Sequence, residues 1–241
     1  MRQTYIFRKV EETEELRKIF ALRYQIISKC HLAPFLEQNC EGIDIAPYDV
    51  NAIHYGLYLQ EQLIGTIRVV KSHDKYTNPI VSSILHGHYR NNIDRSSNTD
   101  AIAPLPFLEY GAEIPEHIQY YNSCKDHNIE IVEGGRFVIL PEYRNIRVFK
   151  FFIESVFASC FILENSFTHA VATCTVDHAH FYRYYGFNVI GPENGYVVND
   201  TKLVTFSVPL GTLLPIPVQF HEKFRELAST FSSTGQIECQ L

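Results

Sequence analysis

Two charged residues, Glu133 and Arg136, stand three positions apart in the run EGGRFVILPEYR over residues 133–144. The run reads as a strand that leads directly into a turn and a helix start. A carboxylate in such a position can take a proton from a reacting group, directly or through water. It can equally serve as an ion-pair partner of Arg136 or of Arg68. Glu133 is therefore a candidate general base, and the structural alternative stays open.

Three arginines, Arg23, Arg68 and Arg136, accompany this carboxylate in predicted helices and strands. A guanidinium group meets a carboxylate through a two-pronged fork of hydrogen bonds. These side chains can bind the carboxylate of a substrate or support Asp49, and the sequence does not say which arginine does which. Each of them, taken alone, can also be an ordinary surface residue.

A second cluster, Cys174, Asp177, His178 and His180, has residue types that suit a metal site or a Cys-His nucleophilic pair. The spacing argues against both. His178 and His180 are two positions apart on a predicted helix, so they face different directions. Cys174 ends a strand, where burial is expected. We therefore expect no metal site here.

Composition excludes several functional classes. The net charge of −6 and pI near 6.0 argue against general binding to nucleic acid or anionic membranes, which requires an excess of basic residues. The six cysteines lack a paired zinc spacing, and the N-terminus lacks the apolar run of a signal peptide. No apolar stretch approaches the ~20 residues of a membrane span. A cytoplasmic protein without a transmembrane segment is expected.

Strand-like and helical patterns alternate along the chain. The predicted strands are residues 4–10, 54–59, 63–71, 129–139, 169–173, 187–190 and 203–208. The predicted helices are residues 13–30, 79–89, 145–164, 177–185 and 218–230. Residues 72–129 are rich in Asn, Ser, Pro and His, with a polar loop over 91–100, and read as an insertion over one face. This alternation around an antiparallel hairpin indicates an α/β layer fold.

The run around Glu133 resembles the fourth strand and following turn of the GNAT acyltransferases. Glu133, Arg136 and Phe137 match the Glu-any-Ser-Arg-Phe motif of the acyl-homoserine lactone synthases, with Gly135 in the serine position. Further matches follow in the same order along the chain: Arg23 in LRYQ, Asp49 in PYD, His54, and Arg68 in GTIR.

The resemblance continues in FYRYYGF over residues 181–187, which is similar to the tyrosine-to-Gly-Phe ending common across GNAT enzymes. The lactone synthases carry a tryptophan after the first helix, whereas this chain has none. That difference favours the related N-acyl amino acid synthases, including those associated with exosortase systems.

The resemblance implies a GNAT fold, an α/β architecture whose central mixed, mostly antiparallel sheet is flanked by helices. It implies one domain over residues 1–210, with 72–129 as an insertion, and a C-terminal extension over 211–241. It implies transfer of a fatty acyl group from an acyl carrier protein or acyl-CoA thioester to the amine of an amino acid or related small molecule. No cofactor would be permanently bound. The acceptor-binding residues would be Arg23, Asp49, His54 and Arg68, and the catalytic residues Glu133, Arg136 and Tyr182.

Tyr182 aligns with the tyrosine that protonates the departing thiolate in many GNAT enzymes, although an aromatic residue on a helix can also serve packing alone. In the same enzymes, backbone N–H groups at a helix N-terminus hold the donor's pyrophosphate. The corresponding donor-binding residues would be Val138, Ile139, Arg144, Asn145, Arg147, Val148 and Lys150.

The donor turn departs from the GNAT pattern, because Arg147 and Phe149 replace small residues that let the backbone approach phosphate. An acyl carrier protein is therefore a candidate partner: it is acidic, presents a phosphopantetheine arm, and would suit a basic patch of Arg144, Arg147 and Lys150. Two other functions stay open. They are an acetyl-CoA-dependent acetyltransferase of a small amine or peptide, and a GNAT-like module that binds an acylated ligand without turnover.

Overall fold

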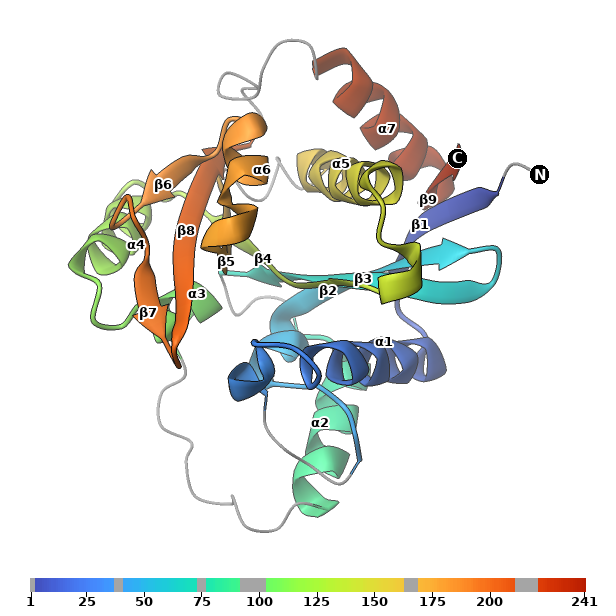
Figure 1. Ribbon diagram of the computed structural model, residues 1–241, viewed down its shortest axis with the longest axis horizontal. Coiled ribbons are helices and arrows are strands. Elements are labelled where there is room, and N and C mark those ends of the chain that lie inside the picture. Colours follow the sequence, from blue (N-terminus) through green and yellow to red (C-terminus); the bar gives the residue numbers. More distant parts are fainter. Residues whose placement is uncertain (1–2, 37–40, 73–76, 92–102, 163–168, 211–220) are drawn as a thin grey trace.

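A computed structural model describes residues 3–36, 41–72, 77–91, 103–162, 169–210 and 221–241. They form a nine-stranded sheet with helices on both faces (Figure 1). This confirms the α/β layer architecture expected from the sequence. None of the helices in these ranges combines the length and apolarity needed to cross a membrane.

The strands follow the order β6-β8-β5-β4-β3-β2-β1-β9, and β7 pairs with β8. All pairs are antiparallel except β4 with β5. The bounds are β1 (Thr4–Val10), β2 (Ala52–Leu59), β3 (Gln62–Lys71), β4 (Ile131–Ile139), β5 (His169–Thr175), β6 (Asn188–Ile190), β7 (Tyr196–Val198), β8 (Thr201–Pro209) and β9 (Gln236–Gln240).

The α-helices are α1 (Thr13–Ile27), α2 (Pro79–Asn91), α3 (Pro106–Tyr110), α4 (Pro115–Asp126), α5 (Ile146–Ile162), α6 (Ala179–Tyr184) and α7 (His221–Thr234). Short 3-10 turns are η1 (Ala33–Phe35), η2 (Pro47–Asn51), η4 (Pro141–Tyr143) and η5 (Val176–His178). Helices α5, α6 and α7 cover one face of the sheet, called here the α5 face. Helices α1 to α4 and η2 cover the opposite face, called here the α1 face.

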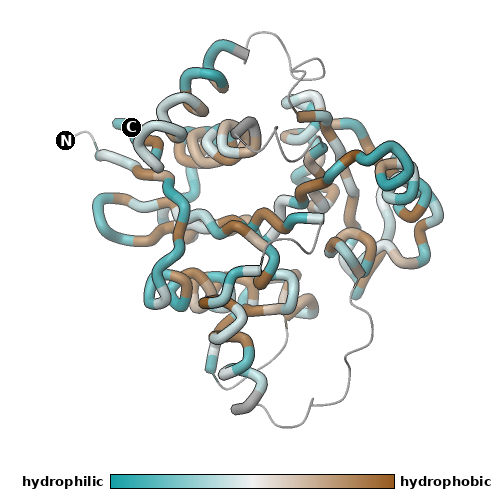
Figure 2. The backbone as a smooth tube through the Cα atoms, turned by 180° about the vertical axis from the view of Figure 1, so that it is seen from behind, coloured by the Kyte–Doolittle hydropathy of each residue, from teal (hydrophilic) through white to brown (hydrophobic). Residues whose placement is uncertain are grey.

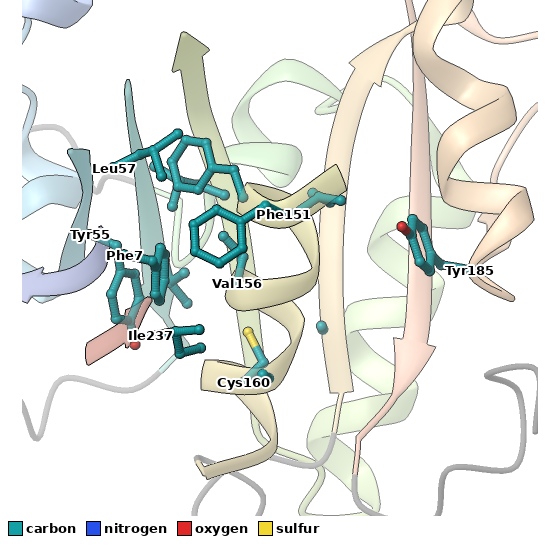
Figure 3. Packing of buried hydrophobic residues seen from close by; sticks show 14 of the residues in the cluster. Phe7, Tyr55, Leu57, Phe151, Val156, Cys160, Tyr185 and Ile237 are labelled. Atoms are coloured by element: carbon teal, nitrogen blue, oxygen red, sulfur yellow. The ribbon is translucent and has the colours of Figure 1, made fainter. Parts of the chain in front are cut away.

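The main core fills the α5 face, where side chains of β1 to β5 and β8 pack against α5 and α7. Figure 3 shows Phe7 and Tyr55 near Ile237, with Phe151 and Val156 of α5 beside them. The Phe7 and Tyr55 rings stack with centroids 5.0 Å apart. In Figure 2 the inner helix α5 is mostly hydrophobic, whereas the peripheral α4 and α7 are mostly hydrophilic. Burial of α5 between the sheet and α7 explains this contrast.

The structure contains elements that the sequence patterns do not reveal. Helices α3 and α4 lie in the predicted insertion, and β9 adds an edge strand beside β1 from the C-terminal segment. The predicted C-terminal helix appears as α7 at His221–Thr234, while positions 218–220 lie outside the described residues. The predicted loop at 91–100 also lies outside them from residue 92 onward.

The sheet divides where its two parallel strands separate. β4 and β5 pair only through Ile131–His169 to Gly134–Ala172, after which β4 continues to Ile139 without β5 beside it; β5 pairs with β8 along its whole length. Figure 1 shows the β6-β8-β5 part turning away from the β1-β3 part. The divergence places the second half of β4 at the point where groups from both faces can meet.

Candidate active site

Five of the predicted site residues converge on the α1 face. Arg23 comes from α1, Asp49 from η2, His54 from β2, Arg68 from β3 and Glu133 from β4. His54 and Arg68 are direct partners across the β2–β3 ladder, and Arg68 faces Gly135 across the β3–β4 ladder. The alternation of strand side chains therefore places these polar residues on the same face, under α1 and η2.

Asp49 is the centre of a buried ion-pair network. Its side chain and that of Arg23 are both 0% exposed. Arg23 donates from Nη1 to Asp49 Oδ1 at 2.8 Å and from Nε to Asp44 Oδ2 at 2.8 Å. Arg68 donates from Nη1 to Asp49 Oδ2 at 3.1 Å, and the backbone N–H of Ala46 donates to the same oxygen at 2.8 Å. Asp49 therefore holds two guanidinium groups in fixed positions.

His54 lies beside this network as a neutral ring. Its pKa is lowered to about 4, mainly by burial; Asp49 acts in the opposite direction, and the nearby guanidinium groups act in the same direction as burial. Its Nε2 lies 3.2 Å from the Asp49 carbonyl oxygen. Its Nδ1 is buried and has no hydrogen-bond partner in the described structure. Nδ1 is thus an unused polar atom at the edge of the charged cluster.

Glu133 is almost completely buried, with 3% of its surface exposed. Its Oε2 accepts a hydrogen bond from the backbone N–H of Phe107, the second residue of α3, at 2.9 Å. Burial raises the pKa of Glu133 to about 8, against the opposing effects of the Phe107 N–H and Arg68; the negative charge of Glu109 adds to the rise. Neither Arg68 nor Arg136 forms an ion pair with it in the described chain. At neutral pH Glu133 is mostly a neutral acid near its titration point.

The raised pKa of Glu133 predicts a pH-dependent stability. Between its ordinary value of 4.5 and about 8, the folded protein binds more protons than the unfolded chain. The free energy of unfolding therefore falls as pH rises through this window, by up to about 1.4 kcal/mol per pH unit from this group. We expect Glu133→Gln to gain stability relative to wild type over the same window, as measured by urea unfolding. If the difference in unfolding free energy between Glu133→Gln and wild type does not change with pH, the raised pKa of Glu133 is contradicted.

A β-bulge in β4 brings Arg136 to the same cluster. Thr66 pairs with Val138 and Arg68 with Gly135, so β4 carries one extra residue in this interval. Arg136 takes a left-handed backbone conformation, with φ of 54°. Its Nη2 donates to the carbonyl oxygen of Phe35 at 3.0 Å, and its Nε lies 3.1 Å from Asp44 Oδ2 without hydrogen-bond alignment. A bulge redirects a side chain in this way, at the cost of local backbone strain.

The predicted donor-binding residues lie at the end of β4 and the start of α5. Val138 and Ile139 are buried in the part of β4 beyond its pairing with β5. Arg144 donates from Nε to the Ile139 carbonyl oxygen at 2.8 Å. The exposed side chains here are Arg144, Asn145, Arg147 and Lys150, together with Ile146, which is 65% exposed.

Asn145 caps helix α5. Its Oδ1 accepts hydrogen bonds from the backbone N–H groups of Arg147 and Val148, both at 3.1 Å. These amides belong to the first turn of the helix, where an anion would otherwise bind. The sequence signal of an Asn before a helical run predicts such a cap. Asn145 therefore occupies the N–H groups that a donor phosphate would require.

Tyr182 lies on the α5 face rather than beside Glu133. Its ring stacks on Phe206 of β8, with centroids 5.3 Å apart, and meets the edge of Phe187. Burial raises the pKa of its hydroxyl well above the ordinary value, so the group stays protonated. The nearby aromatic chain of Phe137, Phe149 and Phe181 connects β4, α5 and α6. Packing and proton donation are both compatible with this position.

Four further groups belong to the site although the sequence did not single them out: Asp44, Tyr48, Glu109 and the backbone N–H of Phe107. Asp44 stands between Ile43 and Ile45, and an acid in an apolar run is a signal that could have identified it. The Phe107 N–H is a backbone group, so the residue type gives no indication of its role. The Tyr48 hydroxyl and Arg68 Nε are buried without hydrogen-bond partners among the residues described.

The competing Cys-His cluster does not form a reactive site. Burial raises the pKa of the Cys174 thiol to about 12, which disfavours the thiolate needed for nucleophilic attack. His178 lies 3.0 Å from the Thr175 hydroxyl, and His180 3.0 Å from the Asp177 carbonyl oxygen. Over the described ranges, no three His, Cys, Asp or Glu side chains converge as metal ligands.

No protein-family model matches the sequence, and no curated protein matches it. The structure is similar to several solved structures. FeeM, an N-acyl amino acid synthase from uncultured soil microbes, has a TM-score of 0.53 and 17% identity, over 86% of this chain and 91% of FeeM. BjaI, a CoA-dependent acyl-homoserine lactone synthase, has a TM-score of 0.60 and 12% identity, over 93% of this chain and 90% of BjaI.

The acyl-homoserine lactone synthase LasI has a TM-score of 0.53 and 15% identity, over 90% of this chain and 95% of LasI. Similarity at these identities concerns the fold. The expected GNAT fold is therefore confirmed, as is the expected structural likeness to the N-acyl amino acid synthases and lactone synthases.

Proposed function

We propose that this protein is an N-acyltransferase that moves an acyl group from a phosphopantetheine thioester to the amine of an amino acid. One observation carries the proposal. A buried carboxyl group with a pKa of about 8, Glu133, lies beside a cluster of arginines where β4 separates from β5. The fold shared with FeeM and the lactone synthases supports this class of reaction.

The charge balance of the cluster favours an acceptor with a carboxylate. Arg23, Arg68 and Arg136 surround two aspartates, Asp44 and Asp49, while His54 is neutral. Each arginine pairs with an aspartate, but these three arginines carry one positive charge more than the two aspartates offset. Arg68 Nε and Arg136 Nε are buried donors with no hydrogen-bond acceptor within the described chain. A substrate carboxylate satisfies both the charge and the donors, as an amino acid would.

We assign different roles to the three arginines. Arg23 has no exposed surface and serves to hold Asp44 and Asp49, so we assign it and Asp49 to positioning. Arg68 Nε and Arg136 Nε make no aligned hydrogen bond in the described chain, although Arg136 Nε lies 3.1 Å from Asp44 Oδ2, and we assign both arginines to the acceptor carboxylate. His54 contributes its unused Nδ1 beside them. The assignment follows from which polar atoms the network leaves unsatisfied.

Glu133 acts as the base in the reaction that we propose. The amine nitrogen attacks the thioester carbonyl carbon, forming the C–N bond, and its proton passes to the ionised Glu133 directly or through water. The C–S bond then breaks, and the departing thiolate takes a proton from the Tyr182 hydroxyl. The proton gained by Glu133 leaves to solvent and a solvent proton returns to Tyr182, which restores both groups. The products are an amide and a free thiol. A base with a pKa near 8 is suited to this step at neutral pH.

The start of α5 favours an acyl carrier protein as the donor. Asn145 fills the N–H groups of Arg147 and Val148, which weakens the site for coenzyme A pyrophosphate. Arg144, Arg147 and Lys150 surround the exposed Ile146 on a protein whose net charge is −6. A basic surface with an apolar centre is complementary to an acidic carrier protein.

The donor assignment makes a prediction for Asn145→Gly. Glycine is only a few tenths of a kcal/mol weaker as a helix N-cap, so the fold should be retained. The variant frees two amides for phosphate, and we expect KM for acyl-CoA to fall severalfold while KM for the acyl carrier protein donor is unchanged. Steady-state kinetics with both donors measure this, with Asn199→Gly as the control in the β7–β8 turn. Equal changes for both donors contradict the proposal.

The proposed function is tested by a product screen. Purified protein is incubated with acyl carrier protein and acyl-CoA donors of several chain lengths, pooled amino acids and adenosylmethionine, and mass spectrometry identifies new N-acyl products. A long-chain N-acyl amino acid from the carrier-protein donor supports the proposal and names the acceptor. Product only from acetyl-CoA indicates an ordinary acetyltransferase, and no product from any donor rejects transfer.

A further inference from the structure

Helix α3, from the inserted segment, closes the site over Glu133. The backbone N–H of Phe107 holds the Glu133 carboxyl at 2.9 Å. The Tyr110 ring meets the Phe35 ring edge-on, with centroids 5.4 Å apart, and the Phe35 carbonyl oxygen accepts the bond from Arg136. Helix α3 and turn η1 thus meet above the arginine cluster. Glu109 lies between the two contact residues on the same short helix.

Glu109 faces the site beside a buried hydroxyl group. Tyr48 is 8% exposed, its ring lies 5.8 Å from the Arg68 guanidinium carbon, and its hydroxyl has no hydrogen bond of normal geometry in the described chain. The Glu109 carboxylate lies beside this hydroxyl and close enough to interact with Glu133. Glu109 itself is exposed, so its carboxylate is accessible to a ligand that enters from solvent.

We propose that Glu109 and the Tyr48 hydroxyl bind the ammonium group of the acceptor amino acid and so select a zwitterion. This inference rests on the proposed function. A positive group, Arg68, and a negative group, Glu109, both lie close enough to Glu133 to act on it, and a zwitterion carries complementary charges at a short separation. The Tyr48 hydroxyl, which lies beside the Glu109 carboxylate, supplies a second polar contact. Glu109 thereby becomes a binding residue for the group that reacts. The bound ammonium gives one proton to water before its nitrogen attacks, and the second proton passes to Glu133 as the amide forms.

The charges around Glu133 explain why a second acid is useful. The titratable and charged groups that influence or adjoin Glu133 are Arg68 on β3, Glu109 on α3, Tyr196 on β7 and Tyr48 on η2. Because Glu133 is mostly neutral at neutral pH, it cannot by itself attract an ammonium ion. An ammonium group held by Glu109 would lower the pKa of Glu133 and ionise it. Acceptor binding would thus create the base.

The first test compares Glu109→Gln with wild type in steady-state kinetics. We expect KM for the acceptor to rise about 10-fold or more, because a hydrogen bond to a charged group contributes ~1.5–3 kcal/mol. KM for the acyl donor should stay unchanged. Tyr48→Phe should raise KM for the acceptor by a smaller factor. Glu113→Gln, an exposed acid that follows α3, is the matched control. Unchanged acceptor KM in Glu109→Gln overturns the inference.

The second test needs no turnover. NMR follows the side-chain carboxyl carbon of Glu133 in free protein, and the standard amino acids are added one at a time. In free protein the pKa of Glu133 should fall in Glu109→Gln, since a neighbouring negative charge is removed. At least one amino acid should lower the pKa of Glu133 in wild type and leave it unchanged in Glu109→Gln. No response in wild type, or the same response in both proteins, rejects the inference.

The two tests separate the inference from the proposed function. If no acyl donor yields product but an amino acid shifts Glu133 only when Glu109 is present, acyl transfer is rejected while zwitterion binding stands. If product forms and KM for the acceptor is the same in Glu109→Gln as in wild type, acyl transfer is supported and the binding role of Glu109 is rejected.

Discussion

Replacement of Glu133 by glutamine is expected to lower the rate of amide formation by roughly 10²- to 10⁴-fold, the range that a positioned general base contributes. Glutamine keeps the size of the side chain and can still accept the Phe107 N–H, but it cannot take a proton. Because Glu133 must be ionised to act, kcat/KM of the wild type should rise with pH and level off above its pKa of about 8. The residual kcat/KM of Glu133→Gln should not show a rise with this pKa.

The measurement is a pH–rate profile for both proteins with one acceptor and one donor. Glu61→Gln, in the exposed β2–β3 turn, controls for a change of charge elsewhere. A loss of less than about 10-fold, or a profile that keeps the same ionisation in Glu133→Gln, contradicts the assignment of the base. Product analysis at one pH cannot replace the profile, because a merely positioning acid would also reduce the rate.

Replacement of Asp49 by asparagine is expected to destabilise the fold by about 3–5 kcal/mol, the cost of leaving a buried charge without its partner. Asp49 binds both Arg23 and Arg68, and none of the three side chains is more than 3% exposed. Asparagine fills the same volume but provides no negative charge. Asp44 would then have to offset three arginines.

Urea unfolding monitored by circular dichroism measures this loss, since the chain contains no tryptophan for fluorescence. Asp177→Asn is the control, because Asp177 is an exposed aspartate at η5. A loss smaller than about 1 kcal/mol would show that the network does not depend on Asp49. If Asp49→Asn does not fold, Asp49→Glu retains the charge and should recover part of the stability.

The sheet was largely predictable from the sequence because its strands carry strong local patterns. β2 and β3 are rich in strand-forming residues on either side of the polar turn at Glu61, and β1 precedes an amphipathic helix, so these strands were recognised. The strand of Glu133 was recognised with its following helix for the same reason. Ordered motifs then identified Arg23, Asp49, His54 and Arg68, which the structure brings to one cluster.

The remaining features depend on tertiary contacts. β9 is a five-residue strand whose pairing with β1 decides its conformation. Helix α3 has only five residues, too few for a periodic pattern, and its role comes from the backbone N–H of Phe107. The bulge at Arg136 is visible only in the register between β3 and β4. Asn145 stands directly before a helical run, which is a sequence signal of a helix cap. The family resemblance instead implied a donor-binding role for it.

Acyl transfer is tested most directly by the stoichiometry of its two products. A thioester donor is mixed with the acceptor found by the product screen, and the moles of free thiol and of N-acyl amino acid are measured in the same sample over time. The proposed reaction predicts equal amounts of both, with both formed roughly 10²- to 10⁴-fold more slowly by Glu133→Gln. Free thiol without amide would show a thioesterase, and the absence of both would show a protein that binds without transferring.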